Sequence, residues 1–148
     1  MRLITFISLV ILGLSCANTK NIAMKPNRLN GTWVPVQEEL GGTSLPKAAF
    51  EKQKLIIDDG AYTFITESID KEVVKYTDDD KMDIYGKEGV NTGKHFTAIY
   101  KFVPGASNGE TGLLTICYNL SGDSYPETFE TRAKPALFLA VFKKETSK

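Results

Sequence analysis

The stretch HFTAIYKF, residues 95–102, decides the fold class, because apolar side chains recur at every second position. The apolar set is Phe96, Ala98, Tyr100 and Phe102. Between these positions lie Thr97, Ile99 and Lys101. Successive side chains of an extended chain point to opposite faces, so a period of two predicts a β-strand with one buried face.

Strand signals continue on the amino-terminal side of this stretch. Residues 54–67, KLIIDDGAYTFITE, form two β-rich runs around Asp58-Asp59-Gly60, and Asp-Gly is a favoured turn pair of β-hairpins. Weaker strands are expected at Val73–Thr77 and Met82–Tyr85. A strand is also expected within GTWVPVQEEL, residues 31–40. The first half of the domain is therefore predicted to consist mainly of short strands.

Strands are expected on the carboxyl-terminal side as well. LLTICYNL, residues 113–120, and a short segment at Thr128–Thr131 precede Ala136–Phe142, which is apolar on both faces. Such a run is typical of a strand that lies between a core and another covered surface. One short helix is expected in SLPKAAFEK, residues 44–52, starting near Pro46.

Together these signals predict an all-β fold with about eight or nine antiparallel strands and one short helix. A closed barrel is the preferred architecture, because closure removes exposed sheet edges, and a β-sandwich is the alternative.

The composition is that of a folded domain rather than a disordered chain, with 42% hydrophobic and 24% charged residues in 148. Eighteen basic and eighteen acidic side chains cancel. A nucleic-acid-binding protein should show a basic excess or stripe, and none is visible. We therefore expect no nucleic-acid partner, and we expect a monomer.

The amino terminus is typical of a secretory signal peptide over residues 1–15. Arg2 supplies the positive charge, and the apolar run Leu3–Leu14 is shorter than the roughly 20 residues that a membrane-spanning helix needs. LGLSC, residues 12–16, resembles a bacterial lipobox, although Gly13 and Leu14 depart from the usual pattern. The alternative is ordinary secretory cleavage near Ser15 or Ala17, with Cys16 incidental.

The lipobox resemblance implies that Cys16 becomes the first mature residue and carries palmitate-type acyl chains that anchor the protein in a membrane. Residues 16–28 would then be a tether, and residues 29–145 the barrel domain. The expected location is the cell envelope, facing the periplasm, with Ala17 favouring the outer over the inner membrane. Cys117 is expected to be a small buried hydrophobe. A Cys16–Cys117 disulfide is the alternative.

LNGTW, with Gly31 and Trp33, resembles the Gly-x-Trp signature of the lipocalins. Residues 29–145 are similar to a family of uncharacterised lipocalin-like bacterial domains that is abundant in planctomycetes. The shared motifs are the Gly-x-x-Leu-Pro turn at 42–46, KLIIDDGAYTF, Met82-Asp83, Gly93-Lys94, AIYKF and LTICYNLSGDSYPETFET. The resemblance implies a fold and no established activity. Tyr125-Pro126 stands where that family has Arg-Pro, so the arginine's role is absent here or supplied elsewhere, for instance by Arg132.

By analogy with lipocalins, Gly31 and Trp33 are expected to close the floor of the barrel, with Lys143 or Lys144 above the indole ring. Candidate ligand-lining residues are Phe96, Tyr100, Phe102, Tyr118 and Phe129; Phe138 and Phe142 are also expected to point inward. An eight-stranded barrel can be filled by side chains or hold one small ligand, so a packed core and a cavity both remain open.

No motif indicates catalysis, a cofactor or a metal. His95 is the only histidine, and it lacks neighbours at metal-ligand spacing. Asp78, Asp79, Asp80 and Asp83 could bind calcium, but the spacing lacks the glycine and distal glutamate of an EF-hand, which favours a solvated turn.

We therefore predict a non-enzymatic binding protein for a small hydrophobic or amphipathic ligand. The alternative is a protein-interaction module, such as an enzyme inhibitor or immunity lipoprotein, that uses the loops at 85–94 or 104–112.

Overall fold

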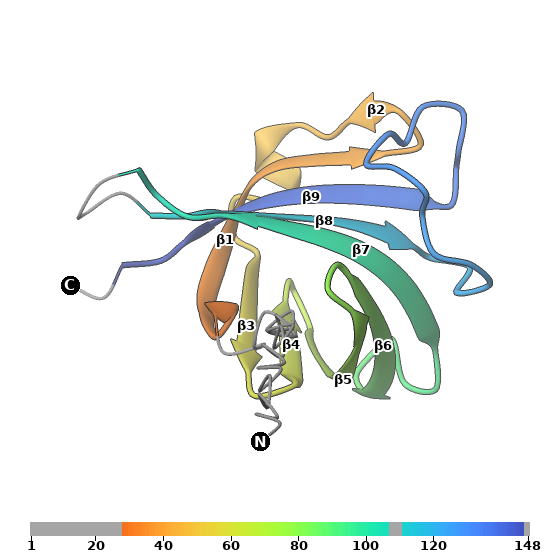
Figure 1. Cartoon of the computed structure of the whole chain (residues 1–148), viewed down its shortest axis with the longest axis horizontal. Helices are drawn as coiled ribbons and strands as arrows, with labels where there is room; N and C mark the ends of the chain where they lie inside the picture. Colours follow the sequence, from red (N-terminus) through yellow and green to blue (C-terminus); the bar gives the residue numbers. More distant parts are fainter. Residues whose placement is uncertain (1–27, 107–110, 147–148) are drawn as a thin grey trace, which may run out of the picture.

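The computed structural model describes residues 28–106 and 111–146, which form one antiparallel β-barrel (Figure 1). The predicted signal peptide, Cys16 and nearly all of the tether lie outside the described residues, as does part of the 104–112 loop. The strands are β1 (Gly31–Leu40), β2 (Thr43–Ser44), β3 (Lys54–Asp58), β4 (Ala61–Ile65), β5 (Ile69–Asp78), β6 (Lys81–Glu88), β7 (His95–Val103), β8 (Leu113–Asn119) and β9 (Leu137–Lys144).

Eight strands close the barrel, and the ninth is an addition at its edge. β3 to β9 pair in sequence order, while β1 pairs with both β3 and β9 and so completes the ring. β2 pairs only with the end of β1. The predicted all-β, antiparallel barrel of eight or nine strands is therefore confirmed, and its shape is consistent with a lipocalin-like barrel.

The two ends of the barrel differ because β1 leaves β3 early. The two strands are paired only over Gly31–Trp33, and β1 then continues beside β9 through a bulge between Pro35 and Gln37. We call the end that holds Trp33 the closed end. The end where β1 stops, near Leu40, is the open end (Figure 1).

Every barrel strand contributes apolar side chains to the core. These side chains fill the interior, except near the open end. The alternation in β7 is confirmed, since Ala98 and Tyr100 are buried in the central core, with Phe96 and Phe102 packed against it. At the closed end the ring of Phe102 meets the ring of Trp33 edge-on, with centroids 6.0 Å apart. This contact seals one end of the barrel.

A second apolar cluster lies on the outer face, beneath the loop formed by residues 120–136. Cys117 and Leu137 are buried there together with Ile99, against Tyr125 and Phe129 of the loop. This cover explains why β9 is apolar on both faces, as predicted. It also shows that Cys117 is a buried, free thiol within the described part of the chain.

Two local expectations need correction. The strand expected at Thr128–Thr131 is wrong, because this segment lies in the covering loop. There the hydroxyl of Thr131 accepts from the backbone N–H of Gly42 and donates to Glu39, in place of ladder bonds. The expected helix is a single 3-10 turn, η2 (Lys47–Ala49). Within residues 28–106 and 111–146, no helix has the length and apolar character needed to cross a membrane.

Candidate functional site

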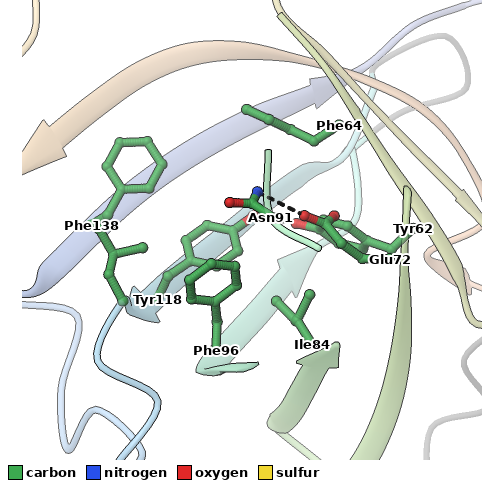
Figure 2. Close-up of a pocket in the computed structure, with 9 residues that line it drawn as sticks. Tyr62, Phe64, Glu72, Ile84, Asn91, Phe96, Tyr118 and Phe138 are labelled. Carbon is green, nitrogen blue, oxygen red and sulfur yellow. Dashed lines mark hydrogen bonds between the residues drawn. The ribbon is translucent and has the colours of Figure 1, made fainter. Parts of the chain in front are cut away.

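A pocket of about 140 Å³ lies inside the open end of the barrel (Figure 2). Its lining is mainly apolar, and five of its nine residues are aromatic. The lining residues are Tyr62, Phe64, Glu72, Ile84, Asn91, Phe96, Tyr118, Leu120 and Phe138.

The strand register brings most of this lining together. Residues directly opposite each other in antiparallel strands project to the same face, so each cross-strand pair delivers two side chains to the interior. Three such pairs line the pocket: Tyr62–Glu72, Ile84–Phe96 and Tyr118–Phe138. The rings of Tyr118 and Phe138 are stacked, with centroids 5.7 Å apart.

Glu72 is the acidic member of the lining, and it is only 5% exposed. Its Oε1 accepts a hydrogen bond of 3.1 Å from the side-chain amide of Asn91. Its Oε2 is buried and has no hydrogen-bond partner among the described residues. Burial raises the pKa of Glu72 to about 7, because the charged form loses its hydration.

Asn91 reaches the pocket because the β6–β7 loop folds back over the end of β6. A Cβ on Gly86 would lie 1.7 Å from the backbone oxygen of Asn91, so this approach requires glycine. The backbone N–H of Asn91 donates to Asp70 Oδ1 at 3.0 Å. Lys94 Nζ donates to the side-chain oxygen of Asn91 at 3.2 Å. The loop thus holds the Asn91 amide against Glu72.

The hydroxyl groups of Tyr62 and Tyr118 are hydrogen-bonded to each other in the interior. Burial raises the pKa of both phenols well above the usual value, so both keep their protons at neutral pH. Only one of the two O–H groups donates within the pair. The hydrogen of the other O–H group is not used within this pair, so it can donate to a different acceptor.

Glu38 is a second interior carboxyl group. Glu39 bonds to the outer loop, so the alternation of β1 directs Glu38 inward, opposite Ala140 of β9. Glu38 is 2% exposed, and burial raises its pKa to about 7. Its Oε1 finds no hydrogen-bond partner in the described part of the chain.

The five aromatic residues proposed from sequence as ligand-lining fall into three groups. Phe96 and Tyr118 line the pocket. Tyr100 packs edge-on against Tyr76, with centroids 5.8 Å apart, and Phe102 packs against Trp33, so both belong to the packed core. Phe129 lies outside the barrel, in the outer cluster, with Lys101 Nζ 4.7 Å from its ring centroid.

The pocket residues not identified from sequence include Tyr62, Phe64, Glu72 and Asn91. The inward-facing positions of β5 include Asp70, Glu72 and Val74. Because two of these three side chains are acidic, the sequence of β5 does not show the alternation of apolar and polar residues that indicates a strand. The usable signal was the Asp-Gly hairpin, because a correct β3–β4 register already directs Tyr62 and Phe64 to one face. Nothing local to Asn91 predicts its reach into the barrel.

Trp33 occupies the closed end and is fully buried. Its Nε1 donates to the backbone oxygen of Leu29 at 2.7 Å, and Lys144 Nζ lies 5.4 Å from the ring centroid. Lys143, the other residue proposed for this contact, is exposed. Gly31 leaves room for Lys144, since a Cβ there would lie 2.6 Å from Lys144 Cε.

His95 and Asp83 belong to a hydrogen-bonded cluster on the outer face. Asp83 Oδ1 lies 2.7 Å from His95 Nε2, and Oδ2 accepts from Tyr125 and Thr77 at 2.7 and 2.9 Å. Burial opposes ionisation of Asp83, but these hydrogen bonds outweigh it and hold its pKa below the usual range. Tyr125 ties the covering loop to β6 through this carboxylate. Arg132 is exposed.

The acidic turn at 78–80 is exposed, and Asp78 pairs with Lys81 at 3.0 Å. Over residues 28–106 and 111–146, no group of three or more histidine, cysteine or acidic side chains is close enough to hold a metal ion.

Comparison of the chain with protein-family models, with curated proteins and with solved structures returned no match.

Proposed function

We propose that this protein is a membrane-anchored, extracytoplasmic binding protein, without enzymatic activity, that holds a small amphipathic molecule in the open end of its barrel. The observation that carries the proposal is the pocket itself. Aromatic and aliphatic side chains provide most of the lining, while Glu72, Asn91 and a tyrosine hydroxyl offer a few convergent polar atoms. Such a combination is typical of small-molecule sites.

The size of the pocket limits what it can enclose. A cavity of about 150 Å³ is large enough for one benzene molecule, and this pocket has a volume of about 140 Å³. A bound molecule would therefore bury one ring or short chain, while any larger part extends past the rim at Leu120. Leu120 is 44% exposed, which leaves an apolar surface for that part.

Native mass spectrometry of the full-length protein, purified gently from its own host's envelope, tests this proposal. We expect a reproducible non-covalent mass that is lost on denaturation. Leu120→Trp places a larger side chain at the rim of the pocket and should reduce the bound fraction. Val103→Trp makes a similar change at an exposed position on β7 at the closed end, and should leave the bound fraction unchanged. A bare polypeptide mass for the wild type would contradict the proposal.

The membrane anchor is a separate part of the proposal, because Cys16 lies outside the described residues. It is supported by the lipobox-like LGLSC sequence after a short apolar segment. Metabolic labelling with an alkyne-tagged palmitate should label the wild type and the Cys117→Ser variant equally. Cys16→Ser should remove the label and release the protein from the membrane fraction. A label that persists in Cys16→Ser would contradict the anchor.

A protein-interaction role is the second candidate, and the exposure of Val90 favours it. This side chain is 66% exposed in the β6–β7 loop, beside the pocket rim. Crosslinking from position 90 in the native envelope should then capture one defined protein, and Val90→Ser should weaken that complex without changing the bound small molecule. Loss of the small molecule in Val90→Ser would instead assign Val90 to the pocket.

A further inference from the structure

The buried charges of the barrel are all of one sign. Among the residues that the structure describes, the buried charged side chains are Glu38, Asp70 and Glu72. Asp70 accepts hydrogen bonds from the backbone of Asn91 and from Ser68. Glu38 and Glu72 each keep one buried carboxylate oxygen that lacks a partner within the described part.

Within the described part of the chain, no lysine forms an ion pair with these carboxyl groups. Lys94 donates to Asn91 Oδ1 rather than to Glu72. Lys71, next to Glu72 in β5, pairs with Glu88 on the outer surface at 2.7 Å. The other titratable groups that act on this interior are the phenols of Tyr62, Tyr76 and Tyr118. A buried carboxylate without a partner is costly, so the pocket favours a guest that brings a positive charge or a strong donor.

The rest of the lining also suits a cation. Figure 2 shows Phe138, Tyr118 and Phe96 on one side of the pocket and Tyr62 with Glu72 on the other, with Asn91 between them. The faces of aromatic rings attract cations, and they do so more strongly where water is excluded. Phe64 adds a fifth ring to the lining. A pocket with one carboxyl group and several aromatic rings is therefore suited to an organic ammonium group.

We propose that the pocket binds a protonated amine with an apolar body, and that the ammonium group donates to Glu72 Oε2 while the body packs among Phe64, Phe96 and Phe138. This inference rests on the proposed function and adds the chemical class of the ligand. A primary amine fits better than a quaternary one, because only N–H groups can satisfy Oε2. An anion would face Glu72, and a purely apolar guest would leave Oε2 without a partner.

The test uses three probes of nearly equal size: 2-phenylethylamine, 2-phenylethanol and phenylacetate. Their binding to the full-length protein, held in detergent micelles, is measured by equilibrium dialysis at pH 8. Detergent micelles without protein serve as the blank. We expect the amine to bind at least roughly tenfold more tightly than the alcohol, because a hydrogen bond to a charged group is stronger than a neutral one. Phenylacetate should bind most weakly.

Glu72→Gln should remove the preference for the amine while binding of the alcohol persists, which also shows that the variant is folded. Glu88→Gln makes the same change at an exposed position and should preserve the preference. Equal or tighter binding of the alcohol or of phenylacetate to the wild type would overturn the amine class and leave the proposed function intact. If none of the three probes binds, the amine class is also overturned. The proposed function is tested separately, by the non-covalent mass that co-purifies with the protein.

Discussion

The side-chain amide of Asn91 donates to Glu72 Oε1 at 3.1 Å and thereby joins the β6–β7 loop to an interior carboxyl group. This bond is the connection between the rim of the pocket and its acidic centre. It stabilises the ionised form of Glu72 and partly offsets the effect of burial on its pKa.

Asn91→Ala should therefore raise the pKa of Glu72 further above its usual range, because burial would act without this opposing hydrogen bond. The unfolding free energy at pH 8 should fall by about 1–2 kcal/mol, since a buried acceptor loses its donor. A carboxyl-carbon NMR titration measures the first effect, and denaturant unfolding measures the second.

Asn30→Ala is the matched control. Asn30 Nδ2 donates to Asp59 Oδ1 at 2.8 Å on the exposed surface of the closed end. This variant should leave the pKa of Glu72 unchanged. A Glu72 pKa that stays the same or falls in Asn91→Ala would show that the bond does not stabilise the charged carboxylate.

The ligand-free protein should lose stability as the pH rises from about 4.5 to above 7. Burial raises the pKa of Glu38 and of Glu72 from the ordinary glutamate value of 4.5 to about 7 in the folded state. The folded state thus binds more protons in this window, and the stability gained from them is lost as both groups ionise. One pKa unit corresponds to about 1.4 kcal/mol, so each group contributes a loss of about 3 kcal/mol.

Thermal melts at pH 5 and pH 8 measure this loss. Glu38→Gln and Glu72→Gln should each flatten the profile by a similar amount, whereas Glu88→Gln should not. Asp83 acts in the opposite direction, but its lowered pKa confines that effect to pH values below about 3.8. A melting temperature that rises from pH 5 to pH 8 would show that both glutamates are solvated or paired in the folded protein.

The contact between Lys144 and Trp33 should have a measurable effect on stability. Lys144→Met keeps an apolar stem over the indole ring but removes the cation, at a cost of about 1 kcal/mol. Lys143→Met changes the exposed neighbour and should have no effect. Because Trp33 is the only tryptophan, its fluorescence reports unfolding directly. Equal stability of the two variants would mean that the cation makes no net contribution.

The barrel itself could be predicted from the sequence, because its strands carry local signals. The Asp-Gly turn between β3 and β4 has Asp59 and Gly60 at φ of 44° and 90°, the conformation that such a pair favours in tight hairpins. The alternation of β7 likewise follows from one buried and one partly covered face. These features depend on neighbours in the sequence, so they are visible without the fold.

The pocket could be predicted only in part, because it depends on contacts between distant residues. Glu72 has the polarity of an exposed residue, and only the closure of the barrel places it inside. Phe129 was expected to line the pocket from its aromatic character, but the loop at 120–136 carries it to the outer face. No local pattern distinguishes the inside of a barrel from an outer face that a loop covers.

The hydrogen bond between Tyr125 and Asp83 should control how well the covering loop shields Cys117. Tyr125 anchors this loop by donating to Asp83 Oδ2, and the loop buries the Cys117 thiol. Burial also raises the pKa of Cys117 to about 11, so the thiol is both covered and protonated at neutral pH. Asp83→Asn removes the charged acceptor, and transient opening of the loop should speed alkylation of Cys117 roughly tenfold, as expected for about 1.4 kcal/mol of lost stabilisation.

Peptide mapping by mass spectrometry measures the rate at this site. Asp80→Asn, in the exposed β5–β6 turn, should react at the wild-type rate. Equal rates for Asp83→Asn and Asp80→Asn would mean that apolar contacts of the loop, rather than Tyr125, keep Cys117 covered.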